Sequence, residues 1–306
     1  MNIKNLVLSG GGVGGFNMYG AIKNMIEKEY LDFNKIEKIY SVSVGAIIAV
    51  IFSLKLDNQI IDDYLIKRPW HKFINIKPNN ILNIWRDKGI FDKSLINIII
   101  KPLLQSKGID ENITLKHFYE ITKIEINMFT VNINTILPEK IKISHLNYPD
   151  LEVCTALAMT SCVPIAFTPL YYDDKCLVDG GIVDNFPLGE FLNDHKDISN
   201  IQNEILCFKI KSNNEKNKIT KDSNLLEYLF RLASTLRALS INKSESYSIN
   251  NIINCNIKNN FLDKWNDALY DEELRKTLIL DGIKDSDQFI TEFKNSFKVS
   301  TDGLAS

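Results

Sequence analysis

The sequence contains few of the residues that build metal centres and disulfide frameworks. Its five cysteines are an odd number without a CxxC pair, and Cys154 and Cys162 lie among apolar residues. No histidine stands at metal-ligand spacing from a cysteine or from another histidine. The four histidines are His71, His117, His145 and His195. We therefore expect no metal site, and a reducing compartment rather than a disulfide-linked fold.

Long apolar runs and a strong excess of one charge are also missing. The longest apolar run, residues 44–54, falls short of the ~20 residues that a membrane-spanning helix needs. The run at the N-terminus is too short for the core of a signal peptide. A formal net charge of −2 gives no reason to expect a nucleic-acid partner. We expect a cytoplasmic protein, either free or peripheral to a membrane.

Alternating strand and helix patterns indicate the fold class. Strand, helix, strand and helix within the first 54 residues are typical of an α/β protein with a mainly parallel sheet. Strands are expected at residues 3–8, 38–42, 123–134 and 204–211, and helices at residues 19–29 and 45–54. The polar stretch after residue 211 marks a boundary between residues 1–210 and a mainly helical extension, residues 211–306. We expect this extension, including a helix over 225–239, to pack on the same domain.

Glycine is concentrated in one place. Five of the 14 glycines fall within GGGVGG, residues 10–15, directly after the first expected strand. Such a cluster indicates that another group must approach the backbone closely, or that the backbone must adopt positive φ. One interpretation is nucleotide binding, because Gly10, Gly12 and Gly15 fit the G-x-G-x-x-G spacing. That fingerprint also needs an acidic residue at the end of the second strand, where this sequence has SVSVG, so this interpretation ranks last.

The SVSVG stretch, residues 41–45, favours a different function. A serine between small residues at a strand-to-helix turn is typical of a nucleophile elbow, with Ser43 as the nucleophile. Gly45 has the size that the turn needs, and Ser41 stands where glycine is usual. N–H groups of the glycine loop could then form an oxyanion hole beside Ser43. The candidate donors are Gly10, Gly11, Gly12 and Val13.

A simpler alternative is that Ser43 only caps the N-terminus of the apolar helix. This alternative leaves the glycine cluster without an explanation. A serine nucleophile also needs a base, and DGG places Asp179 at the end of an expected strand, followed by Gly180 and Gly181. An Asp-Gly turn is the ordinary explanation for that motif. The two elements already found make Asp179 our candidate base.

Together, GGGVGG, SVSVG and DGG resemble the patatin-like phospholipase family. In that family, G-G-G-x-[KR]-G, G-x-S-x-G and D-G-[GA] form a serine–aspartate dyad without histidine. The order of the motifs matches, as does Gly20, and the resemblance covers about residues 3–210. Two positions depart from the pattern: Gly14 stands in place of lysine or arginine, and Ser41 in place of glycine.

The resemblance implies a three-layer α/β/α fold in which residues 1–210 are the catalytic domain. It implies a calcium-independent lipid acyl hydrolase of phospholipase A type, with Ser43 and Asp179 as the dyad and no cofactor. The partners would be a phospholipid or another acyl-ester lipid and a membrane surface; some family members also need an activating protein. A lipid-binding protein without turnover is the alternative that Gly14 and Ser41 motivate.

One further segment combines aromatic and basic residues. Trp70, Phe73, Ile74 and Trp85 are interleaved with lysines and one arginine. The cations are Lys67, Arg68, Lys72 and Lys77. The pattern fits a patch that contacts a membrane interface. It fits equally well a set of core aromatics with a solvated basic face, and both interpretations stay open.

Overall fold

The computed structural model describes residues 2–74, 84–195, 201–212, 218–221, 249–257 and 267–302, with single residues between 223 and 235. Lys77 and most of the helix predicted over 225–239 lie outside the described residues. Within the described part of the chain, no helix combines the length and the apolar character needed to span a bilayer.

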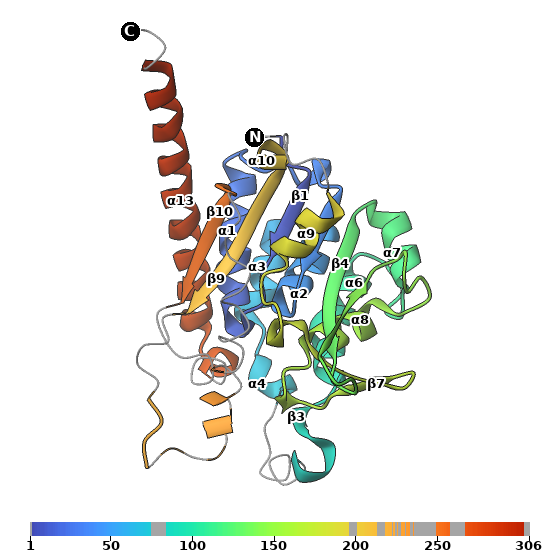
Figure 1. Cartoon of the computed structure of the whole chain (residues 1–306). Helices are drawn as coiled ribbons and strands as arrows, with labels where there is room; N and C mark the ends of the chain where they lie inside the picture. The colour runs from blue at the N-terminus through green and yellow to red at the C-terminus, as the bar shows by residue number, and fades with distance from the viewer. Residues whose placement is uncertain are drawn as a thin grey trace.

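A mostly parallel sheet of eight strands forms the centre of the molecule (Figure 1). Its five parallel strands have the order β10-β9-β1-β2-β4. They are β1 (Asn5–Leu8), β2 (Lys38–Ser41), β4 (Glu125–Asn132), β9 (Ile205–Ser212) and β10 (Ile252–Ile257). Three further strands pair antiparallel beyond them: β5 (Glu139–Ile143) and β8 (Lys175–Asp179) with β4, and β7 (Leu170–Tyr172) with β8.

The register of the sheet brings two predicted motifs to the same edge. Leu8, the last residue of β1, lies opposite Ser41, the last residue of β2. Both strands run in the same direction, so the glycine loop after Leu8 and the turn after Ser41 start side by side. The alternation of the strand side chains sends Leu6 and Leu8 to one face of the sheet and Val7 to the other.

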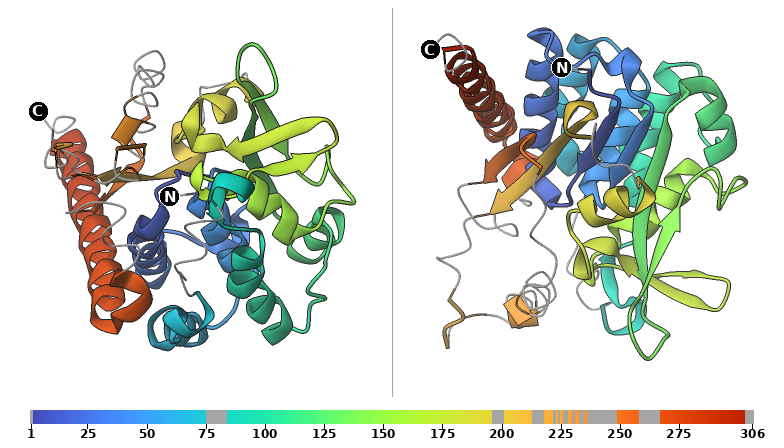
Figure 2. Two further views of the ribbon diagram at one scale, coloured as in Figure 1. Left: turned by 90° about the horizontal axis from the view of Figure 1, so that it is seen from below. Right: turned by 45° about the horizontal axis from the view of Figure 1, so that its top comes forward.

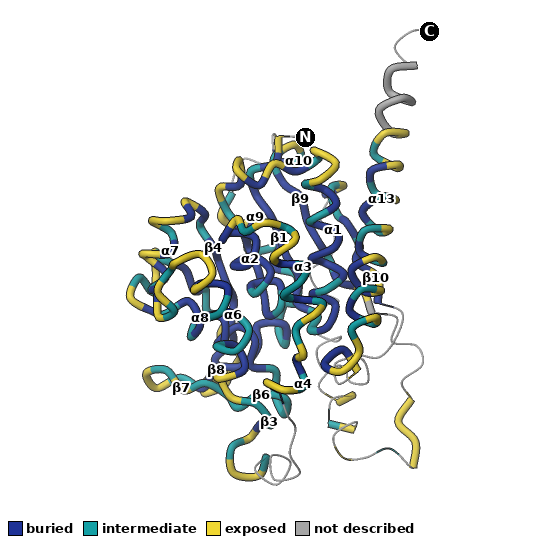
Figure 3. Tube along the Cα trace, turned by 180° about the vertical axis from the view of Figure 1, so that it is seen from behind, coloured by how far each residue is buried: buried dark blue, intermediate teal, exposed yellow. Residues whose placement is uncertain are grey.

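Helices cover both faces of the sheet (Figure 2). The larger layer contains α1 (Gly15–Glu27), α2 (Val44–Ser53), α6 (Ser94–Ser106), α8 (Val153–Ser161) and α13 (Glu272–Asp302). The other face is covered by α9 (Leu188–Asp194) and α10 (Ile201–Glu204). The predicted three-layer α/β/α fold with a mainly parallel sheet and C-terminal helices is confirmed. Figure 3 shows the buried strands between the two layers.

Smaller elements complete the fold around the central sheet. A second sheet pairs β3 (Gly89–Phe91) with β6 (Ile165–Phe167). Helices α3 (Asn58–Lys67), α4 (Trp70–Phe73) and α7 (Leu115–Thr122) lie in the connections. The residues of the aromatic and basic segment differ in burial: Trp70 and Ile74 are each 5% exposed, whereas Trp85 is 87% exposed. For Trp70 and Ile74 the interfacial interpretation is therefore wrong, and they belong to the core.

The region after residue 211 differs from the expected run of helices in one respect. Residues 252–257 form β10, which extends the sheet beside β9. Helix α13 then runs along α1 and β10, at the edge of the molecule (Figure 1). The alternating burial of β10 is a strand pattern, with Ile253, Cys255 and Ile257 buried. The boundary at residue 210 stays a prediction.

Candidate active site

Ser43 occupies the sharp turn between β2 and α2. Its backbone has φ 55° and ψ −129°, a conformation that side chains rarely adopt outside strained functional turns. The Ser43 N–H donates to Thr160 Oγ1 at 3.1 Å, and the Thr160 hydroxyl donates to the carbonyl of Phe129 at 2.6 Å. Helix α8 and strand β4 therefore hold the turn in place. The predicted elbow geometry at Ser43 is present.

Gly45 is needed because the turn lies close to β1. A methyl group at Gly45 would lie 2.6 Å from the carbonyl oxygen of Ser9 and 2.7 Å from that of Leu8, closer than any side chain allows. Ser41 causes no comparable conflict. It stays in β2, fully buried, and its hydroxyl donates to the carbonyl of Asn127 at 3.4 Å. The departure from glycine at position 41 is thus accommodated between β2 and β4.

The glycine loop passes beside Ser43 as a short 3₁₀ turn, Gly12–Gly14. Gly12 and Val13 line the same cavity as Ser43. The N–H of Gly10 donates to the carbonyl of Asn185 at 2.9 Å, so Gly10 cannot serve as the oxyanion donor that we predicted. Gly11, Gly12 and Val13 remain the candidate donors.

Gly14 lies against apolar side chains of the sheet. A methyl group there would be 2.5 Å from Ile257 Cδ1 and 2.7 Å from Ile210 Cγ2. A lysine or arginine at this position would have to displace both isoleucines. The packing of β9 and β10 against the loop therefore requires a residue without a side chain at position 14.

Asp179 ends β8 and is 4% exposed. Its Oδ1 accepts from the N–H of Gly181 at 2.6 Å, which fixes the carboxylate at the start of the next turn. The backbone of Gly180 lies on the carbonyl of Phe129, where a methyl group would approach to 2.3 Å. That carbonyl also accepts from Thr160, the residue that holds Ser43. The serine turn and the aspartate turn are thus built on the same carbonyl.

Asn185 connects the three predicted motifs, and the sequence reasoning missed it. Its Nδ2 donates to the carbonyl of Gly10 at 2.9 Å, while its own carbonyl accepts from the Gly10 N–H. A methyl group at Gly10 would lie 3.2 Å from Ser43 Cβ and 2.4 Å from Asn185 Oδ1. A methyl group at Gly181 would lie 2.5 Å from Asn185 Oδ1 and 2.8 Å from Asp179 Oδ1. Asn185 thus binds the backbone of Gly10, and its side chain occupies the space into which a side chain at Gly10 or at Gly181 would project. The only sequence signal for Asn185 was its place six residues after Asp179.

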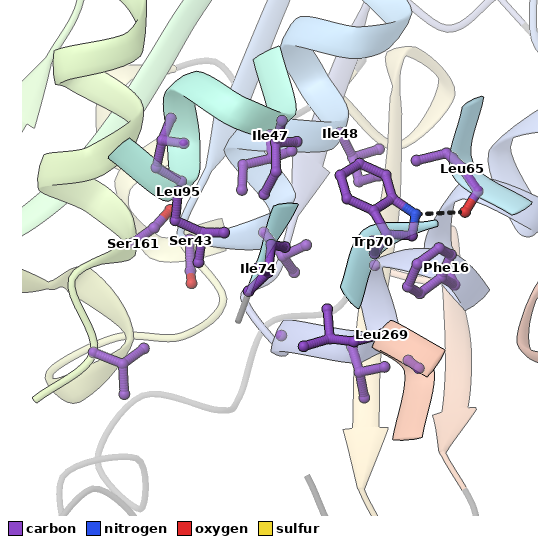
Figure 4. Close-up of a pocket in the computed structure, with 18 of the residues that line it drawn as sticks. Phe16, Ser43, Ile47, Ile48, Leu65, Trp70, Ile74, Leu95, Ser161 and Leu269 are labelled. Atoms are coloured by element: carbon purple, nitrogen blue, oxygen red, sulfur yellow. Dashed lines mark hydrogen bonds between the residues drawn. The ribbon is translucent and has the colours of Figure 1, made fainter. Parts of the chain in front are cut away.

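An apolar cavity of about 160 Å³ adjoins Ser43 (Figure 4). Its wall comes from the glycine loop, α2, α3, α6 and the start of the C-terminal segment, and Ser43 and Ser161 are the hydroxyl side chains among the described lining residues. Trp70, which lines it too, donates its indole N–H to the carbonyl of Leu65 at 3.0 Å. The cavity therefore suits an apolar chain, because it offers a charged group very few polar partners.

The surroundings of Ser43 and Asp179 contain no competing thiolate. Burial, and then the nearby charge of Asp179, raise the pKa of Cys162 to about 12, so that this thiol stays protonated at neutral pH. All five cysteines are buried and free. In the described part of the chain, no cluster of three or more histidine, cysteine or acidic residues could hold a metal ion.

A serine elbow at the carboxyl edge of an α/β sheet, facing an apolar cavity, defines a class of α/β proteins with a candidate serine nucleophile. The family described as patatin-like phospholipase matches residues 6–192 of this chain. The chain belongs to that family.

The chain is also similar to individual proteins from other organisms. The chain is 30% identical over 196 residues to the probable lipid hydrolase 463L of Invertebrate iridescent virus 6, covering 60% of this chain. It is 28% identical over 192 residues to the uncharacterized protein R571 of Acanthamoeba polyphaga mimivirus, covering 63% of this chain. The matches span 62% of the length of each relative. The crystal structure of VipD from Legionella pneumophila shares the fold, with a TM-score of 0.52 and 16% identity over 95% of this chain and 67% of VipD.

Proposed function

We propose that this protein is a lipid acyl hydrolase that cleaves acyl esters of phospholipids, an activity of phospholipase A type. The observation that carries the proposal is the position of Ser43, on a strained turn in the wall of an apolar cavity. The acyl chain of a lipid would fill this cavity, while the ester lay between Ser43 and the glycine loop. Because phospholipids reside in bilayers, the proposal implies that the protein works at a membrane surface.

In the proposed reaction, Asp179 accepts the hydroxyl proton of Ser43 while the Ser43 oxygen attacks the ester carbonyl carbon. Negative charge then develops on the carbonyl oxygen, where the N–H groups of Gly11, Gly12 and Val13 stabilise it. The N-terminus of α2 adds a favourable dipole. The ester C–O bond breaks, and the leaving lysolipid takes the proton from Asp179.

Water completes the proposed cycle. Asp179 accepts a proton from the attacking water, the bond between the acyl group and Ser43 breaks, and the Ser43 oxygen regains that proton. The products are a fatty acid and a lysolipid. The scheme uses no metal ion, so we expect the activity to persist when calcium is removed with a chelator.

The Asp179→Asn substitution tests the dyad. The amide keeps the size of the carboxylate and can still accept from Gly181 N–H, but it cannot accept the serine proton. We expect the release of fatty acid to fall by about 10²–10⁴-fold. The measurement is mass spectrometry of fatty acid and lysolipid formed from phosphatidylcholine vesicles, with and without a calcium chelator.

Asp184→Asn is the matched control for this variant. Asp184 lies five residues further on and pairs with Lys140 at 3.0 Å, so its loss should leave the activity near that of the wild type. Equal rates for Asp179→Asn and the wild type would reject the dyad.

A lipid-binding protein without turnover is the second candidate, because Gly14 stands where the family pattern has a cation and its packing on Ile210 and Ile257 leaves no room for one. A fluorophosphonate that reacts with Ser43 in the folded wild type would reject this candidate. A folded wild type that neither reacts with the probe nor releases fatty acid would support it.

A further inference from the structure

The start of the C-terminal segment, residues 268–275, lies outside the matched residues 6–192 but forms part of the cavity. Ala268 and Leu269 line the cavity and are 4% and 7% exposed. In the view of Figure 4, Ile74 lies between Ser43 and Leu269, and all three line the cavity. A chain bound with its ester at Ser43 would therefore meet Leu269 some distance along its length.

Arg275 fixes this segment to the opposite wall of the cavity. Its guanidinium is 2% exposed and donates to three backbone carbonyls. Nη1 donates to Ala268 at 2.6 Å, and Nε donates to Ile66 at 2.9 Å. Nη2 donates to Ile66 and, at 3.4 Å, to Arg68. The carbonyls of Ile66 and Arg68 lie between Leu65 and Trp70, which line the cavity, so Arg275 sets the separation of two walls.

The same segment also supports the glycine loop. Val13, one of the candidate oxyanion donors, packs in a buried cluster with Ala268 and Leu278. Phe16 and Leu274 pack against this cluster. Movement of the segment would therefore change both the cavity and the loop beside Ser43.

We propose that residues 268–275 form the wall that determines which acyl chains the cavity accepts, with Leu269 as a specificity-determining residue and Arg275 as a positioning residue. The inference rests on the proposed function in one respect, since it takes the cavity to be the acyl site. It adds that acyl-chain selection depends on a segment beyond the matched residues.

Two substitutions of Leu269 in the full-length protein test this proposal by binding alone. Leu269→Trp should fill the cavity beyond Ile74 and weaken binding of C12–C16 fatty acids by at least about tenfold, while C6 changes by less than about twofold. Leu269→Ala should shift the preferred length toward longer chains. Displacement of 11-(dansylamino)undecanoic acid by fatty acids of each length measures the profile, and Leu280→Ala, an exposed leucine of α13, is the control.

Arg275→Lys tests the positioning role. Lysine keeps the charge but cannot donate to three carbonyls with one rigid fork, so we expect the ratio of C12 to C6 affinity to fall by about threefold, with the fold retained by circular dichroism. A wild-type profile in folded Arg275→Lys would overturn the role of Arg275.

The outcomes separate this proposal from the proposed function. Unchanged binding profiles in folded Leu269→Trp and Leu269→Ala would overturn the proposal that residues 268–275 select the acyl chain. No fatty-acid binding by the wild type would overturn it too. Shifted binding profiles in a protein that hydrolyses no lipid would support acyl-chain selection by residues 268–275 and reject the proposed hydrolase activity. Hydrolysis that depends on Ser43, together with unchanged binding profiles, would support the hydrolase activity and reject the acyl-chain selection.

A second observation concerns Ser161, the last residue of α8. Its side chain is 5% exposed, its Oγ has no hydrogen-bond partner among the described residues, and it lines the cavity together with Ser43. Its neighbour Thr160 accepts from the Ser43 N–H, which places Ser161 beside the nucleophile (Figure 4). A buried hydroxyl without a partner is destabilising, so it is usually retained for a ligand or for water.

We infer that the Ser161 hydroxyl donates a hydrogen bond to an oxygen of the bound ester. Ser161→Ala should lower kcat/KM for a p-nitrophenyl ester by about tenfold. Its melting temperature should be unchanged or higher, because the substitution removes an unpaired polar group from an apolar wall. Ser161→Thr, which keeps the hydroxyl, should recover part of the activity.

The melting temperature distinguishes substrate contact from a structural role. A fall in melting temperature that accompanies the loss of activity would assign Ser161 to structure and overturn the inference. Full activity in Ser161→Ala would overturn it as well. If fluorophosphonate labelling maps to Ser161 instead of Ser43, the proposed function fails in its choice of nucleophile.

Discussion

Replacing Ser43 with alanine should reduce the release of fatty acid from phospholipid vesicles by about 10³-fold or more. The substitution removes the only atom that the proposed reaction bonds covalently to the acyl group. It leaves the elbow backbone largely intact, because the N–H of residue 43 still donates to Thr160. The rate is measured as fatty acid formed per minute by mass spectrometry.

Ser53→Ala is the matched control. Ser53 lies at the end of the same helix, is 2% exposed, and donates to the carbonyl of Ala49 at 2.7 Å. It should lose some stability and keep its activity. Hydrolysis by Ser43→Ala at the wild-type rate would reject Ser43 as the nucleophile.

Replacing Gly282 with alanine should destabilise the fold strongly, although alanine normally stabilises a helix by about 1 kcal/mol relative to glycine. A methyl group at Gly282 would lie 1.8 Å from the carbonyl oxygen of Asn17, and one at Gly20 would lie 2.1 Å from that of Ile279. Helices α1 and α13 therefore pack with their backbones in contact. We expect a loss of about 3 kcal/mol, which for a chain of 306 residues lowers the melting temperature by roughly 5 °C.

Lys284→Ala controls for the helix. Its side chain is 75% exposed on α13, so the substitution should change the melting temperature little. Differential scanning calorimetry measures both variants. A Gly282→Ala protein as stable as the wild type would show that α1 and α13 do not approach as closely as described.

The local parts of the site could be predicted from the sequence. GGGVGG and SVSVG are short, and the residues within each motif determine its backbone conformation without help from distant parts of the chain. The positive φ of Ser43 and the buried strand-end position of Asp179 follow from that local chemistry. The glycine loop and the serine turn start side by side because β1 and β2 are parallel and deliver their following loops to one edge. Strand β8, which ends at Asp179, is antiparallel to β4, so this rule does not account for the position of Asp179.

The parts that depend on distant contacts could not be predicted. Nothing near Asn185 in sequence shows that it would bind the backbone of Gly10, 175 positions earlier. A second bond, from the Gly10 N–H to the backbone carbonyl of Asn185, removes that N–H from the set of candidate oxyanion donors. Leu269 has the sequence context of an ordinary apolar residue in a helical region. Its place in the cavity wall, and the bonds of Arg275 to the carbonyls of Ile66 and Ala268, depend on contacts between segments far apart in the chain.

The link that Arg275 makes has a consequence for the order in which this protein matures. Ser43, the glycine loop and Asp179 are all synthesised before the chain reaches residue 180, whereas Ala268 and Leu269, which also line the cavity, follow only after residue 267. A nascent chain, or a product cut by a protease after β9, would carry Ser43 without Ala268 and Leu269 in the wall of its cavity. If Ser43 is the nucleophile that we propose, the complete acyl site would form only once α13 had docked on α1.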